Sequence, residues 1–192
     1  MTDTLAARVL RSVRMLPHGA IEVGVLRHRI DTAFVSESAR LLAEEFRPAN
    51  PTLVLAPAVS GVPTGTVVAV DLGVPILMAR KEGEARGFVI HRSAYSSSEG
   101  IVYDLHVARE DLLSSDRVLI VDDLMQHGQT TAALVEMVRE VKAEVVGVAT
   151  VVEIVPTARN KLRNMGLPED KIKSLVQLEM RGSAFALAPF SE

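Results

Sequence analysis

The stretch Arg117–Thr131, RVLIVDDLMQHGQTT, decides how the rest of the chain is interpreted. Its apolar run, 118–121, is too short for a helix and rich in β-branched residues, which predicts a strand buried on both faces. Asp122 and Asp123 follow this strand, and a polar loop with Gly128 leads into apolar residues at helical spacing. Ligands of open α/β sheets bind beyond the carboxyl ends of the strands. The stretch therefore predicts a site in which the carboxylates face hydroxyl groups or a metal, and the loop and helix N-terminus face a phosphate.

Length and composition exclude several classes of protein. With 192 residues, 48% of them hydrophobic, the chain is long enough for one domain with a substantial core. The net charge of −3 gives no basic footprint for nucleic acid, and the lack of cysteine excludes disulfides, cysteine-ligated zinc and thiol nucleophiles. The first residues lack the apolar core of a signal peptide, and no run of 18 apolar residues occurs. We therefore expect a cytoplasmic protein that binds neither nucleic acid nor membrane.

The remaining patterns alternate between strand and helix. Apolar runs predict strands at 52–58, 75–79 and 145–152, and later ones at 174–178 and 185–188. Helical spacing is found at 4–16 and 66–72, in a segment that begins after Asp31 as N-cap, and from Pro156 to Met165. The polar stretch 82–100 is too long for an ordinary connection and is typical of a lid, whereas 101–107 alternates like an edge strand. This alternation predicts an α/β fold with a mostly parallel sheet.

Two further stretches are candidates for ligand contacts. The small residues of Ala58-Val59-Ser60-Gly61 follow a predicted strand and let a ligand approach the backbone closely. They match neither the P-loop nor the dinucleotide-binding pattern. The cations Arg80-Lys81 end the next strand and, taken alone, are typical of a solvated strand exit.

The stretch 117–131 resembles the phosphoribosyl-diphosphate (PRPP) binding motif of the type I phosphoribosyltransferases, and its Gly128-Gln129 pair is similar to the xanthine branch. The resemblance implies the fold of that family: a central, mostly parallel sheet with flanking helices and a small hood subdomain. It implies a single domain over 1–192. The hood is expected from about 1–30 and 154–192, and the core from about 31–153.

The resemblance also implies residue roles. Asp122 and Asp123 are expected to hold the ribose hydroxyls and to act as the catalytic carboxylates, with Mg²⁺ bound indirectly by Asp122 through PRPP and water. The remaining contacts are implied as follows: Gln126, His127, Gly128, Gln129 and Thr130 for the 5′-phosphate; Ala58, Val59, Ser60, Gly61, Arg80 and Lys81 for pyrophosphate; Ala20, Leu26, Arg27 and Ile154 for the base.

The implied activity is a magnesium-dependent purine phosphoribosyltransferase of purine salvage, which uses PRPP and either adenine or xanthine. Xanthine enzymes have a lysine at the position of Ile154 and an asparagine at that of Arg27. Because isoleucine cannot pair the 2-oxo group and arginine can swing outward, the sequence favours adenine slightly. In relatives the pair corresponding to Arg80-Lys81 can contact the pyrophosphate in the site of a neighbouring subunit, which implies a homodimer.

An alternative is a regulatory or sensor protein that binds PRPP on the same fold without turnover. Ala58-Val59 replaces the Glu-Ser that is usual in the adenine and xanthine branches, and this change favours the sensor. The backbone N–H donors that a phosphate needs are retained. A helix-turn-helix segment, as found in a purine repressor on this fold, is not expected ahead of the hood, which favours the enzyme.

Overall fold

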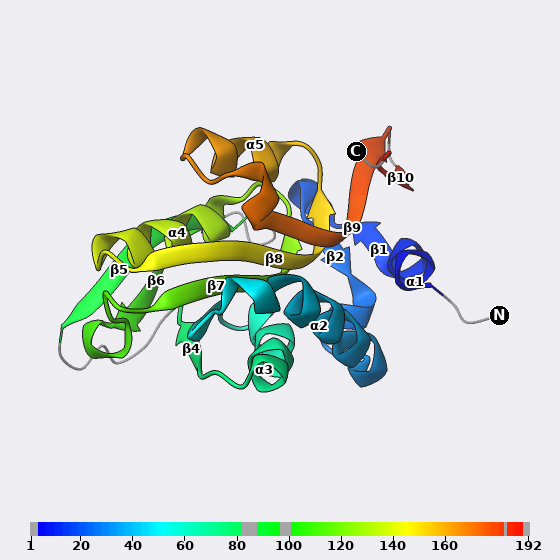
Figure 1. The fold of residues 1–192 in the computed structure, drawn as a ribbon. Coiled ribbons are helices and arrows are strands. Elements are labelled where there is room, and N and C mark those ends of the chain that lie inside the picture. The colour runs from blue at the N-terminus through cyan, green and yellow to red at the C-terminus, as the bar shows by residue number, and fades with distance from the viewer. Residues whose placement is uncertain (1–3, 82–87, 97–100, 183, 190–192) are drawn as a thin grey trace.

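The computed structural model describes residues 4–81, 88–96, 101–182 and 184–189. A six-stranded sheet in the order β10-β9-β8-β7-β3-β4 forms its centre, as Figure 1 shows. Neighbouring strands are parallel except for the antiparallel edge strand β10. The strands are β3 Leu53–Pro57, β4 Ile76–Ala79, β7 Arg117–Met125, β8 Glu144–Ile154, β9 Ile172–Arg181 and β10 Ala184–Leu187. The predicted α/β class with a mostly parallel sheet is confirmed.

Helices cover both faces of this sheet. Figure 1 shows α2 and α3 on one face and α4 and α5 on the other. The bounds are α1 Leu5–Ser12, α2 Thr32–Phe46, α3 Gly61–Leu72, α4 Gln129–Glu140 and α5 Thr157–Asn164. Each face has its own apolar cluster, and consecutive strand residues such as Leu119 and Ile120 belong to opposite clusters. Asp31 caps α2 as predicted, because its carboxylate accepts a hydrogen bond of 3.1 Å from the N–H of Phe34.

The direction of the connections reverses between β3 and β7. From β3 the chain runs through α3 to β4 on one side, and from β7 it runs through α4 to β8 on the other side. The two loops that follow β3 and β7 therefore separate at the carboxyl ends of the strands. A reversal of this kind leaves a crevice in which α/β proteins bind their ligands.

The N-terminal and C-terminal segments lie together at one end of the sheet. The predicted helix over 4–16 is wrong beyond Ser12, because Val13–Met15 forms β1 and pairs antiparallel with β2, Ile21–Val23. A turn at Pro17–Gly19 brings the two strands together. Helix α1 contacts β9 and β10, and Val9, Leu178 and Phe185 share one apolar cluster. The hood boundaries at about 30 and 154 stay a prediction.

A β-hairpin occupies part of the stretch that was predicted to be a long lid. β5, Val89–Ser96, pairs antiparallel with β6, Ile101–Ala108, so the predicted edge strand is confirmed and the continuous loop is wrong. The polar composition of this stretch predicted a loop because much of the hairpin faces solvent. Two of its residues, Ile90 and Ala94, nevertheless pack in the core. The rest of the predicted lid, 82–87 and 97–100, lies outside the described residues. Among the residues that the structure describes, no helix is long and apolar enough to cross a membrane.

Candidate active site

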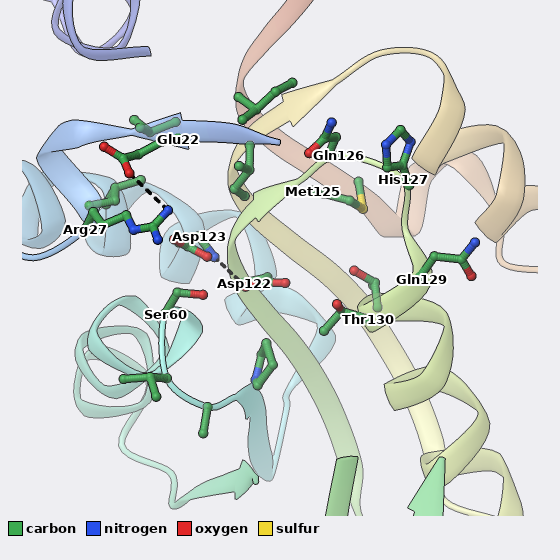
Figure 2. Close-up of a pocket in the computed structure, with 18 of the residues that line it drawn as sticks. Glu22, Arg27, Ser60, Asp122, Asp123, Met125, Gln126, His127, Gln129 and Thr130 are labelled. Carbon is green, nitrogen blue, oxygen red and sulfur yellow. Dashed lines mark hydrogen bonds and ion pairs between the residues drawn. The ribbon is translucent and has the colours of Figure 1, made fainter. Parts of the chain in front are cut away.

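A cleft of about 370 Å³ opens where the connections reverse, beyond the carboxyl ends of β3 and β7. Its walls come from four segments: the hood strand β2, the β3–α3 loop, the β5–β6 hairpin and the β7–α4 segment. Figure 2 shows Asp122 and Asp123 between Ser60 on one side and Thr130 on the other. The predicted site residues that line the cleft are Leu26, Arg27, Ala58, Val59, Ser60, Lys81, Asp122, Asp123, Gln126, His127, Gly128, Gln129 and Thr130.

Four predicted site residues do not line the cleft. Ala20 is fully buried, and its carbonyl accepts a hydrogen bond from the N–H of Leu16. Ile154 is buried in the apolar cluster between the hood and the sheet. Arg80 is exposed, and its backbone bridges to His106 on β6. Gly61 lies directly behind the cleft, because a Cβ added there would approach Asp122 Oδ1 to 3.1 Å.

The predicted phosphate loop ends at the N-terminus of α4. Gly128 precedes the helix with a φ of 69°, and no side chain caps the first turn. The left-handed φ favours glycine, and an added Cβ would also lie 3.1 Å from the Cα of Ala158 on α5. The first N–H groups of a helix have no intrahelical acceptor, so an uncapped N-terminus is suited to bind an anion. The backbone at Gly128 and Gln129 therefore offers a phosphate site.

Two side chains of this loop are engaged by neighbouring segments. Gln126 donates a hydrogen bond of 2.8 Å to the carbonyl of Gly19, which connects the loop to the hood. The side chain of Gln129 accepts a hydrogen bond of 2.6 Å from Lys161 on α5, and Figure 2 shows it directed away from the carboxylates. The phosphate contacts available in this loop are therefore mainly backbone N–H groups and the Thr130 hydroxyl.

The β3–α3 loop forms the facing wall. Val59 is 81% exposed, and Ser60 precedes α3 without a side-chain hydrogen bond that caps the helix. The peptide bond between Ala58 and Val59 is cis, and the N–H of Ala58 is bonded to the carbonyl of Ala79 at 2.7 Å. The cleft therefore lies between the N-termini of two helices, α3 and α4, and Lys81, which follows β4, adds a positive charge to its lining.

The two carboxylates of the site differ in their environment. Asp122 is 5% exposed and accepts a hydrogen bond of 2.9 Å from the N–H of Asp123, whereas Asp123 is half-buried. Burial and, to a smaller extent, the charge of Asp123 raise the pKa of Asp122 well above its ordinary value of 3.8. Burial thus disfavours the charged form of Asp122, and a ligand that donates hydrogen bonds or carries positive charge would relieve this cost.

The hood wall carries an ion-pair cluster that sequence reasoning missed. Glu22 lines the cleft with a side chain that is 9% exposed. Its carboxylate is paired with Arg14, its partner across β1 and β2, at 2.6 Å and with Arg27 at 3.0 Å. The hydrogen bond from Arg14 lowers the pKa of Glu22 despite partial burial, so this carboxylate is charged at neutral pH. Figure 2 shows Glu22 and Arg27 together beside Asp123.

The cleft also contains aromatic residues that had no predicted role. Tyr95 and Tyr103 come from the hairpin, and both line the cleft. They are the only tyrosines in the chain: Tyr95 falls in the polar stretch 82–100, and Tyr103 falls in the predicted edge strand 101–107. The alternating pattern of β6 could have placed Tyr103 on one face of a strand, but no sequence signal indicated which element that face contacts.

The comparisons with known proteins agree on one family. The model of the phosphoribosyl transferase domain matches residues 28–183. A xanthine phosphoribosyltransferase of Deinococcus deserti is 32% identical over 173 residues, which cover 88% of this chain and 90% of the relative. An adenine phosphoribosyltransferase structure from Thermoanaerobacter pseudethanolicus matches with a TM-score of 0.74 and 25% identity over 91% of this chain and 99% of that one. A Trypanosoma brucei adenine phosphoribosyltransferase in complex with AMP, pyrophosphate and ribose-5-phosphate matches in fold, with a TM-score of 0.73 and 19% identity over 92% of this chain and 81% of that one.

We predict that Asp122→Asn stabilises the unliganded protein. Because the folded-state pKa of Asp122 is raised above 3.8, the folded chain retains a proton that the unfolded chain releases as pH rises from 3.8 to the raised value. The free energy of unfolding of the wild type therefore falls through this window, and the loss persists above it. The amide carries no charge and avoids the loss. Urea unfolding at several pH values should show that the advantage of Asp122→Asn grows with pH.

The exposed Asp71 on α3 provides a matched control, since Asp71→Asn makes the same chemical change outside the site. Its effect on the free energy of unfolding measures what the same substitution does outside the site. An Asp122→Asn variant that loses stability relative to the wild type as pH rises would show that the buried carboxylate is not the destabilising group.

Proposed function

This chain belongs to the phosphoribosyltransferase family, and we propose that it transfers the 5-phosphoribosyl group of PRPP to a purine base, with release of pyrophosphate, in purine salvage. One observation carries this proposal: two adjacent carboxylates, Asp122 and Asp123, lie in a cleft between the N-termini of two uncapped helices. PRPP has two anionic groups with a ribose between them. The arrangement of the site matches this order.

The reaction breaks the bond between the anomeric carbon and pyrophosphate and forms a bond from that carbon to a purine nitrogen. Its transition state has oxocarbenium character, as in glycoside hydrolysis. Asp122 and Asp123 accept hydrogen bonds from the ribose hydroxyls and stabilise positive charge that develops on the sugar. The N-terminus of α4 and Thr130 bind the 5′-phosphate, whose binding energy orients the sugar. The β3–α3 loop and Lys81 bind the pyrophosphate.

We propose Mg²⁺ as the cofactor. Among the described residues, no group of three histidine, cysteine, aspartate or glutamate side chains can hold a metal ion. Asp122 would hold the ion indirectly, through PRPP and water, and carboxylate and phosphate oxygens are the donors that Mg²⁺ prefers. When bound, the ion neutralises charge on the pyrophosphate that leaves.

For the base we propose a preference for 6-oxopurines over adenine. The preference for adenine that the sequence suggested required Ile154 in the wall of the base site and an Arg27 side chain that swings outward. Ile154 is buried away from the cleft, whereas Arg27 lines it and is paired with Glu22 at 3.0 Å. A guanidinium has only hydrogen-bond donors, so it matches a carbonyl oxygen and opposes the 6-amino group of adenine. The 32% identity to a xanthine phosphoribosyltransferase supports the same preference.

We predict that Asp122→Asn and Asp123→Asn each lower kcat/KM for PRPP at least about tenfold while the fold is retained, because each removes a charge-assisted hydrogen bond worth about 1.5–3 kcal/mol. The assay measures pyrophosphate release with PRPP and a purine, with and without Mg²⁺, across adenine, hypoxanthine, guanine, xanthine, uracil and orotate.

The same assay separates the enzyme from the alternative function. Transfer by the wild type and its loss in both variants support the enzyme, with Asp71→Asn as a control that should retain full activity. Tight binding of PRPP by calorimetry without turnover of any base would instead indicate the sensor. Wild-type kinetics in both variants would refute the assignment of the site.

We predict that Arg27→Leu lowers kcat/KM for xanthine at least about tenfold, the loss expected for one hydrogen bond from a charged donor, and leaves that for adenine unchanged or higher. Arg29→Leu is the matched control, because Arg29 is an exposed arginine two positions away that does not line the cleft. An equal loss for both bases would contradict the role of Arg27 in base selection.

We also propose a homodimer. Arg80 is exposed outside the cleft of its own chain, whereas its neighbour Lys81 lines that cleft. At this position, the Arg80 side chain could contact a ligand in the cleft of a second copy of the chain. Light scattering should give about twice the chain mass of 20.7 kDa, and a monomer mass at assay concentrations would contradict the proposal.

A further inference from the structure

One tyrosine side chain contacts both anion-binding walls of the cleft. Tyr103, on β6, lines the cleft, and its hydroxyl lies 2.7 Å from Oγ1 of Thr130 in the predicted phosphate site. The ammonium group of Lys81, in the predicted pyrophosphate site, lies 4.4 Å from the centroid of the Tyr103 ring. Thr130 lies in the first turn of α4 and Lys81 follows β4, so Tyr103 contacts side chains from two of the segments that line the cleft. The sequence motifs assign no role to this residue.

The hairpin that carries Tyr103 is fixed to the same two elements that carry its contacts. Arg92 on β5 forms ion pairs with Glu136, at 3.2 Å, and Glu140 on α4, the helix that begins beside Thr130. The backbone of His106 on β6 pairs with Arg80, the neighbour of Lys81. Ala94, opposite Tyr103 in the hairpin register, is buried in the core. These contacts therefore hold the strand that carries Tyr103 in a fixed position beside the cleft.

The chemistry of a phosphate determines the direction of the hydrogen bond between the two hydroxyls. A threonine hydroxyl has one proton to donate and can also accept, whereas the oxygens of an ionised phosphate mainly accept. If Thr130 gives its proton to a phosphate, its oxygen is left to accept from Tyr103. The order Tyr103 to Thr130 to phosphate is then fixed, and each bond in such a chain polarises the next.

The aromatic ring makes a separate contribution. A cation over the face of a ring is attracted by its negative quadrupole. The ring of Tyr103 therefore keeps the ammonium of Lys81 at the cleft, beside the β3–α3 loop. The hydroxyl acts on one anion site and the ring acts on the other, so the two effects can be separated by substitution.

We propose that Tyr103 is a positioning residue for both anion subsites of PRPP: its hydroxyl orients Thr130 toward the 5′-phosphate, and its ring holds Lys81 for the pyrophosphate. This role rests on the proposed function, because it takes the two walls as the sites for those two groups. It adds a residue from the hairpin to a site that the sequence motifs confine to the loops after β3 and β7.

The test uses ribose 5-phosphate and pyrophosphate as separate probes, each measured by titration calorimetry. Tyr103→Phe should weaken ribose 5-phosphate about fivefold, the size expected for one neutral hydrogen bond, and leave pyrophosphate unchanged. Tyr103→Leu, which also removes the ring, should weaken both probes. Val102→Ala is the matched control, since Val102 is the neighbouring residue of β6, 69% exposed and outside the cleft. It should bind both probes as the wild type does.

A double-mutant cycle with Thr130→Val distinguishes positioning from a general effect on the hairpin. In the Thr130→Val background, Tyr103→Phe should have no further effect on ribose 5-phosphate, because its target is gone. Additive effects, or a Tyr103→Phe variant that binds like the wild type, overturn the role of Tyr103 and leave the proposed function intact. A wild type that binds neither probe refutes the proposed function itself.

Discussion

The burial of the Asp122 carboxylate at the end of a parallel strand is the constraint on which the site depends. Burial raises the pKa of Asp122, and the charged carboxylate lowers the stability of the folded chain. The Asp122 carboxylate lies where the chain connections reverse between β3 and β7, with the N-termini of α3 and α4 on either side. Gly61 and Gly128 allow this close approach, since a Cβ at either position would press on Asp122 or on Ala158. The architecture thus produces an acidic centre between the N-termini of two helices.

The proposed binding of PRPP would relieve the cost of burying this acidic centre. The ribose hydroxyls would donate hydrogen bonds to the carboxylates, and the anionic groups of the same ligand would lie at the helix N-termini. The hood also places paired charges at the cleft. Glu22 is charged because it is paired with Arg14, and its ion pair with Arg27 holds that side chain in the cleft. In the proposed function, these fixed charges would orient the base, with Arg27 as the hydrogen-bond donor.

The sequence predicted what local patterns determine. β7 and α4 lie within 24 residues, from Arg117 to Glu140, and hydrophobic periodicity was sufficient to predict a strand and a helix there. The strand was predicted to end before Asp122, but β7 runs through Met125 and includes both carboxylates. Hydrophobic periodicity failed where contacts join segments that are distant in the sequence. Gln126 bonds to Gly19 across 107 residues, and Tyr103 meets Thr130 across 27. The helix predicted through Leu16 ended early because Val13–Met15 gains more as a strand beside β2, a tertiary contact that no periodicity reveals. Ile154 was assigned to the base site from the resemblance, and its place in one apolar cluster with Leu178 of β9 is a further contact between distant segments.

The central claim is that two helix N-termini receive the two anionic groups of one ligand on either side of Asp122 and Asp123. A crystal structure of the protein with PRPP tests it most directly. The account predicts the 5′-phosphate within hydrogen-bond distance of the N–H groups that begin α4, the pyrophosphate against 58–61, and the ribose hydroxyls on the two carboxylates. PRPP bound elsewhere, or bound in the cleft with its phosphate away from α4, would contradict it.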